Sequence, residues 1–117
     1  MYILYGIPNC DSVKKARVWL DSNNISYEFY DYKKSGISKQ RLKAWCSQIG
    51  WENLMNKKSA TWRELDETVQ QAVTGMSKAV EIMAEYTSII KRPVIEQNGK
   101  IVMLRFDEEA YRKIFLQ

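Results

Sequence analysis

The segment 93–104 constrains the fold more than any other part of this sequence. Two short, mainly apolar segments, residues 93–96 (Pro-Val-Ile-Glu) and 101–104 (Ile-Val-Met-Leu), flank the sequence Gln97-Asn98-Gly99-Lys100. An Asn-Gly pair between apolar runs favours a two-residue turn whose backbone twist matches that of paired strands. The sequence therefore predicts an antiparallel hairpin near the carboxyl end of the chain.

The first thirty residues predict a strand–helix–strand unit. Residues 2–5 are aromatic or aliphatic and predict a short buried strand. From residue 11 to about residue 20, apolar side chains recur at the spacing i, i+3 and i+7, which is typical of one helix face. Residues 25–30 alternate well enough for a second strand. Two strands joined by a helix are expected to pair in parallel.

The middle of the chain predicts helices. Residues 33–36 predict a loop, after which Ser38 is placed to begin a helix that Gly50 ends. Short helical pieces are expected at residues 51–55, 62–73 and 78–86. After the hairpin, Asp107 is expected to cap a last helix whose inward side chains are Ala110, Tyr111 and Ile114.

The order βαβ, helices, ββα predicts an α/β chain with a thioredoxin-like fold and a four-stranded mixed sheet. We expect one domain over residues 1–117, in which residues 38–90, approximately, are a helical insertion between the two halves.

Composition excludes several kinds of chemistry. The chain has no histidine and two cysteines. Catalysis that needs imidazole and zinc sites that need imidazole or four thiolates are therefore excluded, and we expect no metal. No secretory signal or membrane-spanning run is visible, so we expect a cytoplasmic protein with reduced cysteines.

The net charge of +4 is uneven, because residues 1–60 hold ten Lys or Arg against five Asp or Glu. This excess favours small anionic ligands or an acidic partner. The basic residues are too scattered to predict nucleic-acid binding, and most are expected to be solvated. We expect a monomer that binds neither nucleic acid nor membrane.

Cys10 is the strongest candidate for a reactive group, since it lies between the first predicted strand and helix. The backbone N–H groups and dipole at a helix N-terminus stabilise a thiolate and also attract oxyanions. Lys14 and Lys15 follow within about one turn and would add positive charge. The alternative is a small buried cysteine that only packs, but the polar loop around Cys10 favours exposure.

The second cysteine is not expected to assist the first. The segment Cys10-Asp-Ser-Val13 lacks a CxxC motif, so an outside thiol would have to resolve a mixed disulfide. Cys46 lies in the middle of a predicted helix and is expected to pack in the core, with a resolving role as the minor alternative.

The segment Tyr5-Gly-Ile-Pro-Asn-Cys-Asp-Ser-Val-Lys-Lys-Ala-Arg17-Val-Trp-Leu20 resembles the opening of the ArsC/Spx family, most closely its YffB-type branch. The segments 61–66 and 91–93 resemble that branch as well. The resemblance implies the thioredoxin-like fold and a cis proline at Pro93 facing the thiol. Members include arsenate reductases coupled to glutaredoxin, glutathione-dependent thiol reductases, and Spx regulators that bind RNA polymerase.

The resemblance also implies site residues. In the family's arsenate reductases, the cysteine attacks the oxyanion and three arginines hold it. Arg92 and Arg105 match two of them, whereas the third falls on or beside Asn56. Asparagine cannot grip an oxyanion bidentately as arginine does, which argues against efficient arsenate reduction. From the residues alone, both arginines could equally be surface charges beside the hairpin.

Two functions of different classes remain. The first is an oxidoreductase, in which the Cys10 thiolate attacks a mixed disulfide or an oxyanion such as arsenate. Lys14, Arg92 and Arg105 would stabilise negative charge, and glutathione (as co-substrate) or a glutaredoxin would release the product, with no bound cofactor. The second is a Spx-like regulator that binds RNA polymerase or another protein; the missing CxxC counts against it.

Overall fold

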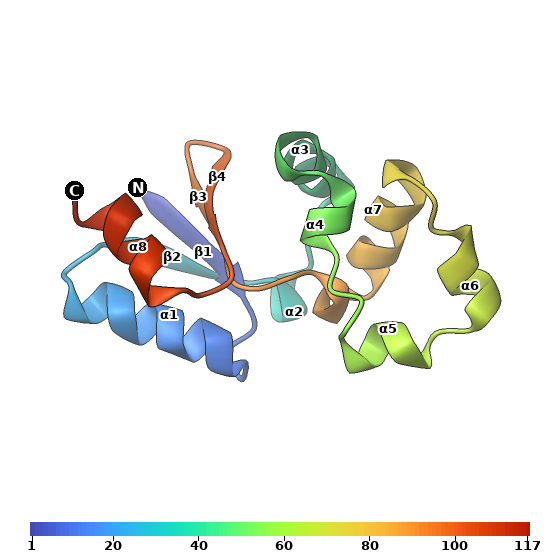
Figure 1. The fold of residues 1–117 in the computed structure, drawn as a ribbon, viewed down its shortest axis with the longest axis horizontal. Coiled ribbons are helices and arrows are strands. Elements are labelled where there is room, and N and C mark those ends of the chain that lie inside the picture. The colour runs from blue at the N-terminus through green and yellow to red at the C-terminus, as the bar shows by residue number, and fades with distance from the viewer. The chain divides into compact units, whose positions relative to one another are not determined.

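The computed structural model describes all of residues 1–117, which divide into two compact units. The first unit contains residues 1–35 and 92–117, and the second contains residues 36–91. The first unit holds the whole sheet, and the second is helical (Figure 1).

The sheet of the first unit has four strands in the order β2-β1-β3-β4. Strand β1 (Tyr2–Gly6) pairs in parallel with β2 (Tyr27–Asp31) and antiparallel with β3 (Val94–Gln97). Strand β4 (Lys100–Leu104) completes the sheet antiparallel to β3. This mixed sheet confirms the predicted α/β class, including the parallel pair at the amino end.

The predicted hairpin is present and its turn has the expected geometry. Asn98 and Gly99 have φ angles of 53° and 81°. Positive φ at both central positions is what the two-residue hairpin turn requires, and Asn and Gly tolerate it best. The local sequence was therefore sufficient to predict this element.

Helices α1 (Asp11–Ser22) and α8 (Glu108–Phe115) share one core with the sheet. Its buried members come from α1, α8 and the two central strands: Leu4, Val13, Ala16, Trp19, Leu20, Ile95 and Tyr111. The rings of Tyr2 and Phe115 meet edge to face, with centroids 4.9 Å apart, so the two ends of the chain lie close together (Figure 1).

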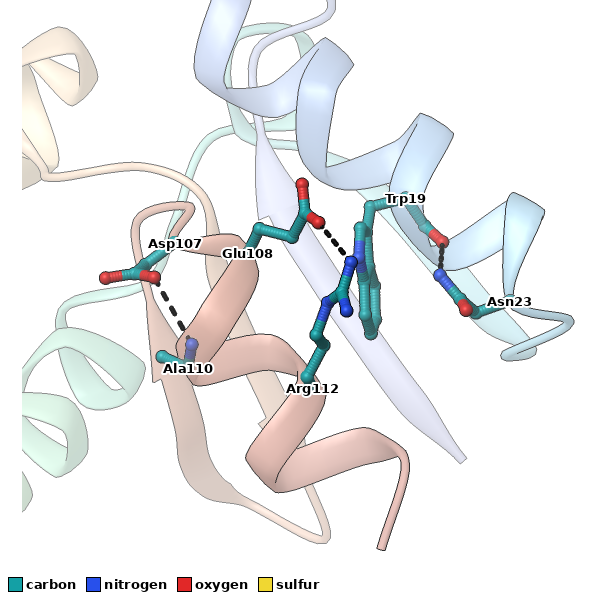
Figure 2. A network of polar contacts seen from close by, with 6 residues as sticks. All are labelled: Trp19, Asn23, Asp107, Glu108, Ala110 and Arg112. Carbon is teal, nitrogen blue, oxygen red and sulfur yellow. Dashed lines mark hydrogen bonds and ion pairs between the residues drawn. The ribbon is translucent and has the colours of Figure 1, made fainter.

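Helix ends in this unit are fixed by side chains. Asp107 caps α8 by accepting a hydrogen bond from the Ala110 N–H at 3.2 Å, as predicted (Figure 2). At the end of α1, the Asn23 side-chain amide donates to the Trp19 carbonyl at 2.9 Å. The first contact satisfies an N–H that the helix itself leaves unpaired, and the second adds to the backbone bond that the Trp19 carbonyl already accepts from the Asn23 N–H.

The prediction that Ile114 of α8 faces inward was wrong. Ile114 is 49% exposed, whereas Tyr111 is fully buried as predicted. Phe115 packs inward instead, against the rings of Trp19 and Tyr111. Both i+3 and i+4 from Tyr111 fit a helix face, and this aromatic cluster selects the second.

The second unit is built of short helices. Helix α3 (Lys39–Ile49) begins at Ser38, whose Oγ accepts a hydrogen bond from the Arg41 N–H, and ends at Gly50 with a φ of 89°. The others are α4 (Trp51–Leu54), α5 (Ala60–Glu64), α6 (Glu67–Ala72), α7 (Met76–Glu85) and the 3-10 turn η1 (Thr87–Ile89). Helices α3, α4 and α7 contact one another. No helix of either unit is long and apolar enough to cross a membrane.

Two element predictions in these regions were wrong. Residues 33–36, predicted as a loop, contribute to the short helix α2 (Tyr32–Ser35). Asp31 causes this, because its Oδ1 accepts hydrogen bonds from the N–H groups of Lys33 and Lys34. The single piece expected at residues 62–73 is two helices, α5 and α6.

Candidate functional site

Four chain segments of the first unit meet at one edge of the sheet. In the parallel pair, Gly6 of β1 lies opposite Asp31 of β2, so the residues after both strands leave the sheet at the same edge. Because β3 runs antiparallel to β1, its first residue, Val94, lies there too, opposite Tyr5 and Leu104. The segments that follow β1, β2 and β4 therefore converge with the segment that precedes β3, and they carry the candidate residues.

Cys10 occupies the N-cap position of α1, as the sequence predicted. Its backbone is extended, with φ −93° and ψ 128°. The Cys10 carbonyl accepts the first bond of the helix from the Lys14 N–H at 3.0 Å, and the Cys10 N–H donates to the Ile7 carbonyl at 3.2 Å. The side chain is half-buried at the margin of the core. The sulfur thus lies at the first turn of a twelve-residue helix.

The surroundings of the sulfur lower the pKa of Cys10 below its ordinary value. Burial acts in the opposite direction and is the largest single effect. Hydrogen bonding from the Val13 N–H, the hydrogen bond and charge of Arg92, and the Ser12 N–H together outweigh it. The thiolate is thus favoured by backbone groups of the helix terminus and by one guanidinium group.

Arg92 and Pro93 lie at this site, immediately before β3. The Arg92–Pro93 peptide bond is cis, as the family resemblance implied. Arg105 reaches the same segment through its backbone, because its N–H donates to the Pro93 carbonyl at 2.7 Å. The Arg105 carbonyl accepts from the Tyr111 hydroxyl at 2.6 Å, which holds this residue at a φ of 66°. Its side chain is exposed.

The other predicted site residues are not brought to the sulfur within the first unit. Lys14 is exposed and lines a surface pocket with Trp19 and Phe106, and no contact joins its ammonium group to Cys10. Asn56 belongs to the second unit. There its N–H donates to the Ile89 carbonyl at 2.6 Å and its Oδ1 accepts from the Lys58 N–H at 3.1 Å.

The second cysteine lies in the core of the helical unit. Cys46 is 5% exposed on α3, and burial raises the pKa of its thiol. In the first unit, the place of a second CxxC sulfur is held by Val13, which is fully buried. Both cysteines are free thiols, and no group of three or more Cys, Asp or Glu side chains is arranged to hold a metal ion.

Tyr32 is a residue of this edge that sequence reasoning missed. It is the first residue of α2, directly after β2, and its side chain is fully buried. Both Arg92 and Cys10 lie near enough to act on the pKa of its hydroxyl, and burial raises that pKa well above its ordinary value. Topology was the available signal, since residues that follow neighbouring parallel strands gather at one sheet edge.

These features define a thioredoxin-like protein with one activated cysteine at a helix N-terminus, an arginine beside it and a cis proline in the adjoining strand segment. Such a site can bind an anion and present a thiolate to it without imidazole or metal.

The chain belongs to the ArsC family, whose model matches residues 5–114. A solved structure of a protein named YFFB is 42% identical, covers 97% of this chain and 98% of its own, and superposes with a TM-score of 0.90. The solution structure of an arsenate reductase (ArsC) related protein from Brucella melitensis is 40% identical over 99% of this chain and 95% of its own, with a TM-score of 0.77. The resemblance to the YffB-type branch is thereby confirmed.

A more distant relative carries a different function in its name. The global transcriptional regulator Spx of Streptococcus pyogenes is 26% identical over 114 residues, which are 96% of this chain and 83% of the regulator. The family therefore contains both reductase-like and regulatory proteins, and family membership alone does not choose between them.

Proposed function

We propose that this protein is a thiol-dependent reductase in which Cys10 is the nucleophile. The observation that carries the proposal is the position of the Cys10 sulfur, at the N-terminus of α1 and beside Arg92, where the pKa of the thiol is lowered. A buried structural cysteine has its thiol pKa raised instead, as Cys46 does in the same chain. The substrate is a glutathione mixed disulfide or an oxyanion such as arsenate.

The disulfide reaction needs two exchanges. The Cys10 thiolate attacks the glutathione sulfur of the mixed disulfide, a bond forms between the two sulfurs, and the substrate leaves as a thiolate. A second thiol, from glutathione or a glutaredoxin, then attacks the glutathionyl sulfur and releases Cys10. The substrate thiol is released reduced, and the two electrons come from the second thiol: glutathione yields glutathione disulfide, and a glutaredoxin yields its mixed disulfide with glutathione. No second cysteine stands at the CxxC position, so the second thiol comes from outside.

The supporting residues have distinct parts in this scheme. Arg92 stabilises the thiolate and the negative charge that passes to the leaving group. Arg105 and Lys14 contribute positive charge around the entering anion, and the sequence position that matches the first arginine of the family's arsenate reductases falls on or beside Asn56. The protein acts as a monomer in the cytoplasm, where glutathione keeps thiols reduced.

The test is the pH dependence of Cys10 alkylation by iodoacetamide, followed by peptide mass spectrometry. We expect the midpoint to lie below the ordinary pKa of a cysteine, and we expect Cys10→Ser to abolish turnover of a glutathione mixed disulfide. Cys46→Ser is the matched control and should retain turnover. A Cys10 pKa at or above that of free cysteine would contradict the nucleophilic role.

The second candidate function is a Spx-like regulator, and the relative from Streptococcus pyogenes is the observation in its favour. In that case Cys10 would be redundant or would sense redox state, and the protein would bind RNA polymerase or another protein. A pull-down with wild type and Cys10→Ser separates the two functions. Specific capture of polymerase by both proteins, together with no reductase activity in either, would favour the regulator.

A further inference from the structure

The hydroxyl of Tyr32 is the most unusual polar group of the first unit. The residue is fully buried, yet no group of the protein accepts a hydrogen bond from its hydroxyl. The other buried tyrosines of this unit are satisfied, since Tyr5 donates to Glu96 at 3.0 Å and Tyr111 donates to the Arg105 carbonyl at 2.6 Å. Leaving a buried hydroxyl unpaired is costly. The position of Tyr32 therefore needs an explanation other than packing.

The surroundings of this hydroxyl supply charge but no acceptor for its proton. Arg92 favours the ionised form of Tyr32 by its charge and as a hydrogen-bond donor to the hydroxyl oxygen, and the charge of Cys10 opposes ionisation. A guanidinium group has only N–H donors, so Arg92 cannot accept the hydroxyl proton. Because burial raises the pKa of the Tyr32 hydroxyl, the group stays protonated at neutral pH and remains a donor close to Arg92 and Cys10.

Resting on the function proposed above, we propose that Tyr32 is a ligand-contacting residue of the Cys10 site. Its hydroxyl donates a hydrogen bond to an anionic oxygen of the ligand that binds beside Cys10 and Arg92. The helix terminus and Arg92 provide the positive field, and Tyr32 provides a neutral hydrogen-bond donor. The substrate is thereby specified as one that carries an anionic oxygen close to the attacked atom, whether an inorganic oxyanion or a carboxylate of glutathione.

The test measures how strongly two unreactive probes protect Cys10 from iodoacetamide. Sulfate stands for the inorganic oxyanion and S-methylglutathione for the tripeptide, so the two probes separate the sources of the anionic oxygen. We expect Tyr32→Phe to weaken protection by at least one probe by about tenfold, because a hydrogen bond to a charged acceptor is lost. The pKa of Cys10 and the unfolding midpoint of Tyr32→Phe should stay close to those of wild type, since the Tyr32 hydroxyl donates no hydrogen bond within the protein.

Tyr5→Phe is the matched control. It removes a satisfied hydrogen bond to Glu96, so we expect a lower unfolding midpoint with unchanged protection by both probes. The proposal is overturned if Tyr32→Phe is protected as well as wild type, or if neither probe protects wild type. Two further results for Tyr32→Phe would overturn it: a lower unfolding midpoint than wild type, or a raised pKa of Cys10 with undiminished protection by the probes.

The failure of the reductase function would look different. If wild type binds the probes through Tyr32 but its Cys10 pKa is not lowered, or no disulfide is turned over, the anion site stands and the reductase does not.

Discussion

At the scale of single residues, the structure gives Arg92 and Arg105 different relations to the Cys10 thiol, although the family resemblance implies the same role for both. Arg92 acts on the sulfur itself and helps to lower the pKa of Cys10. Arg105 is tied to the same strand segment by its backbone, and its exposed side chain has no contact with Cys10. One arginine therefore acts on the Cys10 thiol, whereas the other does not.

Replacing each arginine by glutamine tests this division. Arg92→Gln removes a hydrogen bond and a positive charge from the sulfur, so the pKa of Cys10 should rise and alkylation at neutral pH should slow. Arg105→Gln should leave the alkylation profile in place and raise the KM for an anionic substrate. Stopped-flow alkylation across the pH range, with steady-state kinetics beside it, measures both. Equal effects on the pKa of Cys10 would contradict the assignment.

At the scale of elements, the start of α1 is fixed by a close approach to β1. A Cβ atom on Gly6 would lie 2.7 Å from Cγ2 of Val13, and the Val13 N–H is one of the groups that stabilise the Cys10 sulfur. Only a residue without a side chain permits this approach. The geometry of the thiolate site thus depends on a glycine at the end of the neighbouring strand.

Gly6→Ala should consequently affect both stability and the site. We expect a loss of about 1–3 kcal/mol from overpacking, together with a higher pKa of Cys10, because the helix start must move. Gly99→Ala is the comparison: its φ is +81° and nothing lies within 4 Å, so only backbone strain of about 1–2 kcal/mol is added. Urea unfolding and the alkylation profile distinguish the two variants. A normal Cys10 pKa in Gly6→Ala would show that α1 is not held in this way.

The sequence predicted those elements that are determined by residues close together in the chain, and it did not predict contacts between distant segments. The hairpin at Asn98-Gly99 and the start of α8, capped by Asp107, rest on neighbouring residues, and both predictions were confirmed. Tyr32 could not be recognised locally, because its burial and its neighbours come from strand pairing and from Arg92, sixty residues later in the chain. The surroundings of the Lys14 side chain could not be read locally either, because they depend on which face of α1 the sheet covers.

At the scale of the whole molecule, the chain distributes its two thiols between two compact units. Cys10 lies at the edge of the sheet unit, partly accessible and with a lowered pKa. Cys46 lies in the core of the helical unit, 5% exposed and with a raised pKa. The reactivity of a cysteine requires both access and a thiolate. Cys10 is favoured over Cys46 in both respects.

This difference allows one alkylation experiment to follow two events: opening of the helical unit through Cys46, and loss of the thiolate site through Cys10. Under native conditions, Cys46 should be alkylated at least about 100-fold more slowly than Cys10, because its labelling requires local opening of the helical unit. In rising urea, Cys46 labelling should accelerate steeply as that unit unfolds, whereas Cys10 should slow as the helix terminus and Arg92 separate from it and its pKa returns to the ordinary value. Quantitative mass spectrometry of the two peptides follows both rates. If the changes coincide at one urea concentration, the units unfold as a single cooperative domain; Cys46 labelling that matches Cys10 in native buffer would contradict the buried position.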